Sequence, residues 1–307
     1  MSIDCRLYSQ YSLFAYPAIS TILCHTIYPL RNLYLMSEPT PKELLVVARE
    51  ATAVAAAFLE KEFTKFLHAD DLQITTKESA TDYVTETDLA SQQLIIAVIQ
   101  KHFPEHRFIA EEEGADTLGN PQSPYEWIID PLDGTLNFIH KRENFGTIVA
   151  VQKDGVLLAG SMELPLLDQR FYGAQGEGAL FNDTPIKLRK TKGMTDAILN
   201  CNTLRRAVQG NDGIYRASMP YCASIENSGC AAQELGEVLR GKTDGAFFLG
   251  IRLWDIACGF LLIEEAGGKM HMEALEQGNP RTGYRCAAST QPIFDELWEW
   301  VTTKMEN

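Results

Sequence analysis

The segment 127–138 contains the residue types best suited to chemistry, two carboxylates separated by only two residues, Asp130 and Asp133. Carboxylate and carbonyl oxygens are the ligands that hard Mg²⁺ prefers, and proteins usually hold this ion with a few carboxylates and the phosphates of a substrate. Gly134 follows directly and lets the backbone approach a ligand closely. Backbone N–H groups at the start of a following helix would suit a phosphate. The pattern therefore predicts a metal and a phosphate bound together.

A short buried strand and the start of a helix are needed to position the two carboxylates. The bulky, β-favouring residues 127–129 predict the strand. Pro131 favours an extended Asp130, and Asp133 stands where the chain enters a helix, a favoured N-cap position for aspartate. The alternative is a solvated turn, because proline, aspartate and glycine after a strand also mark ordinary turns.

Two other motifs fail on spacing. An EF-hand loop needs acidic residues at alternate positions and a glutamate at its end, which this segment lacks. A haloacid-dehalogenase-type phosphatase has its aspartates one residue apart before Gly-Thr, whereas two residues separate them here.

The composition is that of a soluble globular protein, with 307 residues of which 45% are hydrophobic and 22% charged. This length allows one large domain or two halves with ample core. The net charge of −14 and the pI of about 4.9 disfavour nucleic acid and membrane as partners, so we expect neither. Seven scattered cysteines without a Cys-x-x-Cys pair indicate neither a disulfide framework nor a zinc site, and favour a cytoplasmic protein.

Residues 1–35 differ from the rest and are expected to be a disordered or artefactual extension. Their apolar stretch 11–30 is interrupted by prolines and a histidine, so it is too broken for a membrane helix. It also lacks a clean small-residue cleavage site, which makes it a poor signal peptide. Met36 looks like a natural start, because Thr40 and Glu43 form a capping box at the beginning of a helix expected near 41–67.

Two halves are expected in the remaining chain, residues 36–192 and 193–307. In the first half, a second helical pattern follows Thr87 and Asp88, so Asp88 is a candidate helix-start acid. A short strand, 108–110, runs into three adjacent glutamates, which usually form a solvated turn but here follow a buried strand end. The segment 152–155 is a hairpin signal between two apolar runs.

Strands and helices alternate in the second half. Asp255 is expected to cap a helix that begins at Ile256, a role compatible with metal ligation. Gly229 stands at another small-residue helix start, which indicates either tight packing or a close approach to an anion. The expected strands are 197–201, 246–249, 269–272 and 286–288, and the expected helices are 231–240, 256–266 and 291–305.

Four motifs occur in a fixed order: Glu-Glu after a strand, Asp-Pro-Leu-Asp-Gly-Thr-x-Asn-Phe, Trp-Asp and Glu-Ala-Gly-Gly. Together they resemble the inositol monophosphatase family of Mg²⁺-dependent, lithium-sensitive phosphomonoesterases, from about Pro41 to about Val301. The resemblance implies a layered α/β (α+β) fold, the αβαβα sandwich of the sugar phosphatases. It also implies a small phosphorylated metabolite as substrate, Mg²⁺ as cofactor and a homodimer.

The resemblance also implies roles for particular residues. The metal ligands would be Glu112, Asp130, Asp133, Asp255 and the carbonyl oxygen of Leu132, with Glu112 chosen over the glutamates beside it. Asp88 would bind Thr135 beside the attacking water, Glu112 would accept a proton or hold a metal, and Lys77 would lie nearby. The substrate side would be formed by Gly134, Thr135, Gly229 and Ala231. Water activated by the metal would attack the phosphate without a covalent phosphoenzyme.

This sequence departs from the family near the expected substrate. Phe248 stands where members that hydrolyse inositol phosphate carry a glutamate, and Arg252 lies four residues further on. An apolar wall with a nearby guanidinium favours a less polar or doubly anionic leaving group over inositol. The alternative is that Phe248 packs in a strand and Arg252 points to solvent.

Several related functions stay open at this stage. The same chemistry would serve adenosine 3′,5′-bisphosphate, fructose 1,6-bisphosphate or histidinol phosphate, although Leu136 and Asn137 replace the Lys-Glu pair of the nucleotidase relatives. A non-catalytic binding protein is the other alternative, and an unused cluster of carboxylates that repel one another argues against it.

Overall fold

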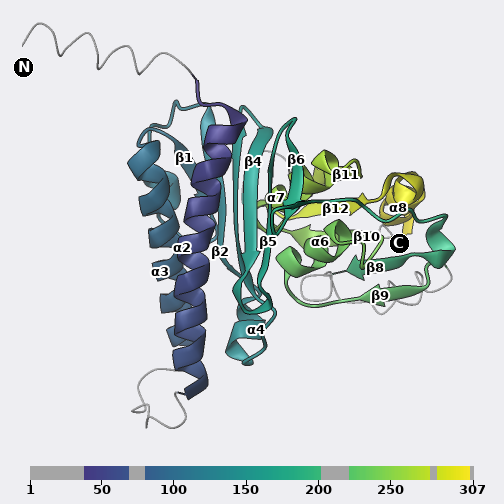
Figure 1. Ribbon diagram of the computed structural model, residues 1–307, viewed down its shortest axis with the longest axis horizontal. Coiled ribbons are helices and arrows are strands. Elements are labelled where there is room, and N and C mark those ends of the chain that lie inside the picture. The colour runs from purple at the N-terminus through teal and green to yellow at the C-terminus, as the bar shows by residue number, and fades with distance from the viewer. Residues whose placement is uncertain (1–37, 69–79, 202–220, 277–281, 305–307) are drawn as a thin grey trace, which may run out of the picture. The chain divides into compact units, whose positions relative to one another are not determined.

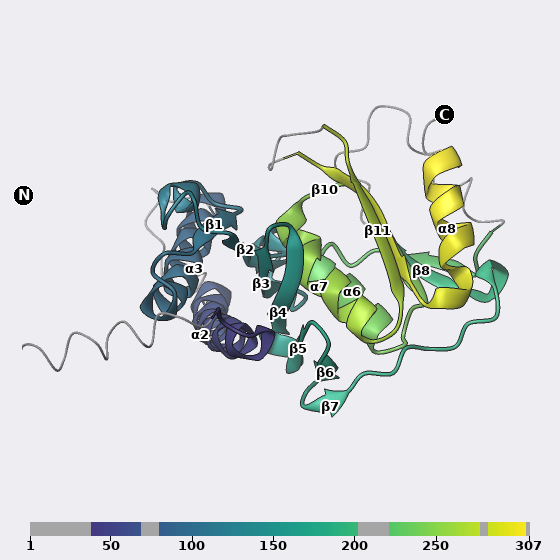
Figure 2. The same cartoon turned by 90° about the horizontal axis from the view of Figure 1, so that it is seen from above.

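The computed structural model describes residues 38–68, 80–201, 221–276 and 282–304 (Figure 1). The expected extension 1–35 and Lys77 lie outside these residues. Residues 41–307 form one compact unit. Within this unit, Figures 1 and 2 show five layers: a helix pair, a sheet, a second helix pair, a second sheet and a final helix. The layered αβαβα sandwich expected from the sequence is thus confirmed.

The first layer consists of helices α2 (Pro41–His68) and α3 (Ala80–His102). Helix α2 begins with proline at its first position, which needs no N–H partner there, and an apolar stripe from Leu44 to Phe66 is buried. Helix α3 starts eight residues before Asp88, which therefore lies inside the helix and not at its start. The polar and β-branched residues of this first stretch have low helix propensity, which explains why the sequence pattern placed the start too late.

The second layer is a seven-stranded sheet in sequence order. Strand β1 runs parallel to β2, and the other neighbours are antiparallel. All nine residues of β2 are buried, because helices cover both faces of the sheet. The strands are β1 (Arg107–Ala110), β2 (Tyr125–Asp133), β3 (Gly146–Lys153), β4 (Val156–Leu164), β5 (Gln169–Ala174), β6 (Gly178–Phe181) and β7 (Thr184–Pro185).

The second half of the chain supplies the other three layers. Helices α6 (Ala231–Leu239) and α7 (Leu253–Glu265) lie between the two sheets, and α8 (Gln291–Lys304) covers the far side of the second sheet (Figure 2). The second sheet has the order β11-β12-β10-β8-β9. Its strands are β8 (Ile198–Cys201), β9 (Ser224–Glu226), β10 (Gly245–Ile251), β11 (Lys269–Ala274) and β12 (Tyr284–Ser289). The chain passes from the first sheet to the second between β7 and β8, near the expected boundary between the two halves. That these halves are separate domains stays a prediction.

Adjacent residues of β10 face opposite layers of the core. Phe247 packs against Trp300 of α8, with ring centroids 5.0 Å apart. Phe248 points the other way, into the apolar cluster around α6 and α7, and none of its surface is exposed. The expected substrate contact of Phe248 is therefore wrong, because the alternation of side chains along a strand turns it into the core.

Candidate active site

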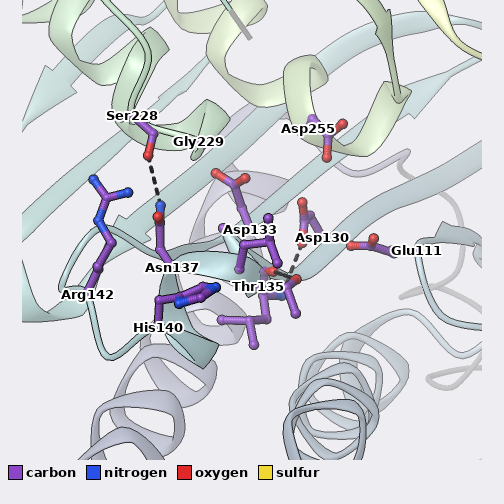
Figure 3. A pocket seen from close by; sticks show the side chains of 13 residues that line it. Glu111, Asp130, Asp133, Thr135, Asn137, His140, Arg142, Ser228, Gly229 and Asp255 are labelled. Carbon is purple, nitrogen blue, oxygen red and sulfur yellow. Dashed lines mark hydrogen bonds between the residues drawn. The ribbon is translucent and has the colours of Figure 1, made fainter. Parts of the chain in front are cut away.

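A pocket of about 320 Å³ opens where the end of β2, the short helix α4 (Thr135–Ile139) and the starts of α6 and α7 meet (Figure 3). Most of the residues expected at the site line it, together with several that were not expected. The lining residues are Glu111, Asp130, Leu132, Asp133, Gly134, Thr135, Leu136, Asn137, His140, Arg142, Ser228, Gly229 and Asp255.

Three carboxylates converge in this pocket. One oxygen each of Asp130, Asp133 and Asp255 can be chosen so that all lie within 4.8 Å of one another. Burial and the charges of neighbouring carboxylates raise the pKa of Asp130 well above its ordinary value, and burial also raises the pKa of Asp133. Without a cation, such a cluster keeps protons to limit repulsion. The site therefore fits a positively charged ion.

An irregularity at the end of β2 brings Asp130 and Asp133 to the same side. The pairing of β2 with β3 shifts register between these two residues, as at a β-bulge, so side chains three apart no longer point to opposite faces. The Oδ1 atom of Asp130 accepts the N–H of Leu132 at 3.1 Å. The hydroxyl of Ser91 on α3 donates to the carbonyl oxygen of Pro131 at 2.9 Å. The neighbouring helix therefore helps to fix the irregular segment.

Asp133 was expected to be the N-cap of the helix that follows it. Instead, its carboxylate binds the start of α6, which is distant in sequence. Its carboxylate accepts the backbone N–H groups of Ala231 at 3.1 Å and Ala232 at 2.6 Å, and the thiol of Cys230 at 3.0 Å. Gly134 takes the N-cap position of α4, with φ +83°. The N–H of Ala231 thus faces Asp133. Ala231, which was expected on the substrate side, does not line the pocket.

Asp255 enters the pocket from the first turn of α7. It is the third residue of the helix rather than its cap, and its Oδ2 atom reaches back to the N–H of Arg252 at 2.9 Å. This hydrogen bond holds the carboxylate toward the pocket. Arg252 occupies the N-cap position and does not line the pocket, so its expected substrate contact is not formed.

Glu111, rather than the expected Glu112, lines the pocket beside the carboxylate cluster. Its N–H donates to the carbonyl oxygen of Ile129 at 3.1 Å, and Figure 3 shows its carboxylate directed toward Asp130. Burial and the charges of Asp255, Glu112 and Asp133 raise the pKa of Glu111 to about 7. Parallel pairing of β1 with β2 places the first residue after β1 beside this segment.

Glu112 is held outside the pocket by its backbone. Its N–H donates to Oε1 of Gln92 at 3.1 Å, and Nε2 of Gln92 donates to its carbonyl oxygen at 3.2 Å. This pair of hydrogen bonds fixes the backbone of Glu112 on α3. Three adjacent glutamates offered no pattern by which the sequence could tell these positions apart.

Asp88 and Thr135 do not form the expected hydrogen bond. The Thr135 hydroxyl donates instead to the carbonyl oxygen of Leu132 at 3.0 Å. Asp88 is buried, and its Oδ1 atom has no hydrogen-bond partner among the described residues. Burial and the charges of Glu111 and Glu112 raise its pKa to about 9. A buried oxygen without a partner beside a carboxylate cluster is consistent with a bound water or ion.

The other side of the pocket contains residues that sequence analysis missed. Figure 3 shows Arg142 and His140 across the pocket from Asp255 and Glu111. Asn137 ties this side together, because its Nδ2 atom donates to the carbonyl oxygens of Asn144 at 2.7 Å and Ser228 at 2.9 Å. Asn137 could have been found as part of the aspartate motif, but Arg142 lies in a loop without a recognisable pattern.

The five layers and the carboxylate pocket at the end of β2 define a layered α+β protein of the sugar-phosphatase type. Residues 40–299 match the family model described as the inositol monophosphatase family. The chain belongs to this family, whose members are generally metal-dependent phosphatases of small phosphorylated substrates.

Two curated relatives carry different names. A "Nus factor SuhB" of Pasteurella multocida is 35% identical over 228 residues, which cover 73% of this chain and 83% of the relative. An "Inositol-1-monophosphatase" of Mesorhizobium japonicum is 33% identical over 228 residues, which cover 73% of this chain and 84% of the relative.

Solved structures agree with the fold. An inositol monophosphatase from Anabaena (Nostoc) is 31% identical and covers 86% of this chain and 96% of its own, with a TM-score of 0.72. SuhB of Mycobacterium tuberculosis, with a TM-score of 0.73 and 22% identity, supports the fold alone. In the described part of the chain, no helix combines the length and the apolar character that a membrane span requires.

Proposed function

We propose that this protein is a Mg²⁺-dependent phosphomonoesterase that hydrolyses a small phosphorylated polyol, sugar or related metabolite with a metal-activated water. One observation carries the proposal: oxygens of Asp130, Asp133 and Asp255 lie within 4.8 Å of one another in an open pocket. The family supports the phosphatase chemistry. We further propose a cytoplasmic homodimer.

The donor set favours Mg²⁺ over softer ions. The cluster contains only carboxylates, and the carbonyl oxygen of Leu132 is the expected additional ligand. Cys230 is close, but its thiol donates to Asp133, and burial raises its pKa well above the ordinary value, so it stays protonated and is a poor metal ligand. We propose Glu111, Asp130, Asp133, Asp255 and Leu132 as the metal ligands.

The residues of the chain would bind the phosphate and place the water. A divalent cation bound here would neutralise phosphate charge and lower the pKa of a bound water. The first N–H groups of α4, from Thr135 onward, have no acceptor within the helix, and their residues line the pocket beside Gly134. The Thr135 hydroxyl gives its hydrogen to Leu132, so its lone pairs can accept a hydrogen bond from water.

Glu111 and Asp88 are the candidates for handling the proton of that water. Glu111 lines the pocket beside Asp130, where its carboxylate could accept a proton from a bound water. Asp88 contributes a buried oxygen that has no partner among the described residues. We propose that Asp88 and Thr135 act on the water from two sides, without the direct hydrogen bond that the resemblance implied.

The substrate is tested by a panel of phosphate esters. Because Phe248 is buried in the core, it gives no reason to exclude inositol 1-phosphate as the substrate. One relative is named as an inositol-1-monophosphatase. The protein should release phosphate from at least one of inositol 1-phosphate, glycerol phosphate, fructose 1,6-bisphosphate, histidinol phosphate and adenosine 3′,5′-bisphosphate. Release should require Mg²⁺ and stop on chelation. Absence of metal-dependent release across the panel would favour the non-catalytic alternative, to which the name Nus factor also points.

A further inference from the structure

The pocket has two electrically different sides. The carboxylates of Asp130, Asp133 and Asp255 occupy one side, and the guanidinium of Arg142 lies on the other, next to His140 (Figure 3). A phosphate bound through metal at the carboxylates would direct its ester group away from them. The leaving group of such a substrate would therefore face Arg142, a cation in a protein whose net charge is −14.

We propose that Arg142 binds a second anionic group, a phosphate or a carboxylate, on the leaving group of the substrate. The inference rests on the proposed phosphatase function and deepens it by naming the class of substrate. Arginine suits this task because its planar fork binds carboxylate and phosphate oxygens in pairs.

Arg142 is available for a ligand. No ion pair or side-chain hydrogen bond engages its guanidinium among the described residues, whereas Arg107, Arg189 and Arg285 each pair with a carboxylate. Its neighbour Lys141 is directed elsewhere, with its ammonium nitrogen 5.5 Å from the ring centroid of Phe66. Of these two adjacent cations, only Arg142 lines the pocket.

The backbone around Arg142 is held by hydrogen bonds, and the exposed side chain extends from this fixed segment. The N–H of Arg142 donates to the carbonyl oxygen of Asn137 at 2.8 Å. Asn137 in turn donates to Asn144 beyond the loop and to Ser228 before α6. The loop is thus tied to both walls of the pocket, which lowers the ordering cost of binding.

There is room for a leaving group that reaches Arg142. A second pocket of about 390 Å³ shares Arg142 and Ser228 with the first, so Arg142 borders both spaces. Glu226 and Glu237 line this second pocket further on. Lys242 lines it as well, and Arg142 is the cation that the two pockets share.

The test compares substrates that differ only in the second charge. In the first pair, 3-phosphoglycerate carries a carboxylate where glycerol 3-phosphate has a hydroxymethyl group. In the second, longer pair, fructose 1,6-bisphosphate carries a second phosphate that fructose 1-phosphate lacks. With Mg²⁺ present, the wild type should have the higher kcat/KM for the doubly anionic member of at least one pair. Arg142→Gln should lower that preference about 10- to 100-fold, mainly through KM, because a charge-assisted pair is lost.

Two variants separate this role from a general effect of charge. Lys141→Gln removes a neighbouring cation that does not line the pocket and should leave the preference unchanged. Arg142→Lys keeps the charge without the fork and should retain part of the preference. Turnover of the singly charged substrates should also survive in Lys141→Gln.

The outcomes distinguish the two proposals. If the wild type hydrolyses these esters but shows no preference, or if Arg142→Gln leaves the preference intact, the role of Arg142 is refuted and the phosphatase function stands. If the wild type releases phosphate from another member of the wider panel but from none of these four esters, the role of Arg142 is refuted and the phosphatase function stands. If it releases none from any ester tested with Mg²⁺, both proposals fail.

Discussion

Asp133 joins the chemistry of the pocket to the packing of the protein. Its carboxylate lies in the acidic cluster and also accepts hydrogen bonds from Cys230, Ala231 and Ala232 at the start of α6. Donors of this kind favour the ionised carboxylate, yet burial still raises the pKa of Asp133. At the scale of single residues, the site thus combines carboxylates held ready for a cation with hydrogen bonds that fix their direction.

Exchange of one glutamate for glutamine tests which of two neighbours belongs to the site. Glu111→Gln should lower kcat/KM at least about 100-fold, because it removes a carboxylate beside Asp130 and Asp255. Glu112→Gln is the matched control and should lower it less than about tenfold, since its backbone hydrogen bonds to Gln92 remain. Initial rates of phosphate release at saturating Mg²⁺ measure both. If Glu112→Gln lowered kcat/KM more than Glu111→Gln, Glu112 would be the metal ligand instead.

The pKa shifts predict how the metal-free protein responds to pH. Asp88, ordinarily at 3.8, has a pKa of about 9, and Glu111, ordinarily at 4.5, has one of about 7. The folded state therefore keeps protons that the unfolded chain releases. The stability from these groups is complete below about pH 4 and is lost as the pH rises through 7 to 9. His106 acts oppositely at lower pH, because burial lowers its pKa from 6.5 to about 4.

The corresponding measurement is the melting temperature between pH 6.5 and pH 9, where His106 contributes little. Chelator-treated protein should melt at a lower temperature as the pH rises, and Mg²⁺ should reduce this dependence because it stabilises the ionised carboxylates. A melting temperature that stays level or rises with pH in the chelated protein would contradict the assignment.

At the scale of elements, the end of β2 and the short helix α4 carry the site. Gly134 joins them with φ +83°, and a Cβ atom there would lie 2.9 Å from the carbonyl oxygen of Asn144 and 3.2 Å from Cβ of Cys230. The turn thus needs glycine both for its backbone conformation and for close contact with the start of α6.

Replacement of this glycine can be compared with a glycine that has the same conformation but free space. Gly134→Ala should destabilise the protein by about 2–3 kcal/mol and lower activity, because strain and contact add. Gly155→Ala, at φ +82° with nothing within 4 Å of the added Cβ, should cost only about 1 kcal/mol and leave activity intact. Denaturant unfolding and phosphate release measure both effects. Equal destabilisation would show that contact at Gly134 is unimportant.

The elements also show what the sequence could and could not predict. Apolar periodicity located α2 almost to the residue, and the Asp-Gly turn located the β3–β4 hairpin, because these signals are local. The start of α3 was missed because its first residues have low helix propensity. The positions of Phe248 and Arg142 depend on strand register and on a loop tied by Asn137, and neither is encoded in a short pattern.

At the scale of the whole unit, the pocket forms only when both halves of the chain are assembled. Asp130 and Asp133 come from the first sheet, whereas Asp255 comes from α7 and Gly229 from the segment before α6, both in the second half. Gly229, with φ +74°, turns the chain into α6 beside Asn137. The proposed division near residues 191–193 therefore describes the order of the chain, and the proposed catalysis would need residues from both parts.

The central claim is that this carboxylate cluster holds the cation that drives phosphoester hydrolysis. It is tested most directly by the rate of phosphate release from glycerol phosphate against Mg²⁺ concentration, for chelator-treated wild type and Asp130→Asn side by side. The variant keeps the Oδ1 acceptor for Leu132, so its circular dichroism should match the wild type. We predict saturable Mg²⁺ dependence for the wild type and a rate at least about 100-fold lower for the variant. Full activity of Asp130→Asn at moderate Mg²⁺, or undiminished release by the wild type in chelator, would contradict the account.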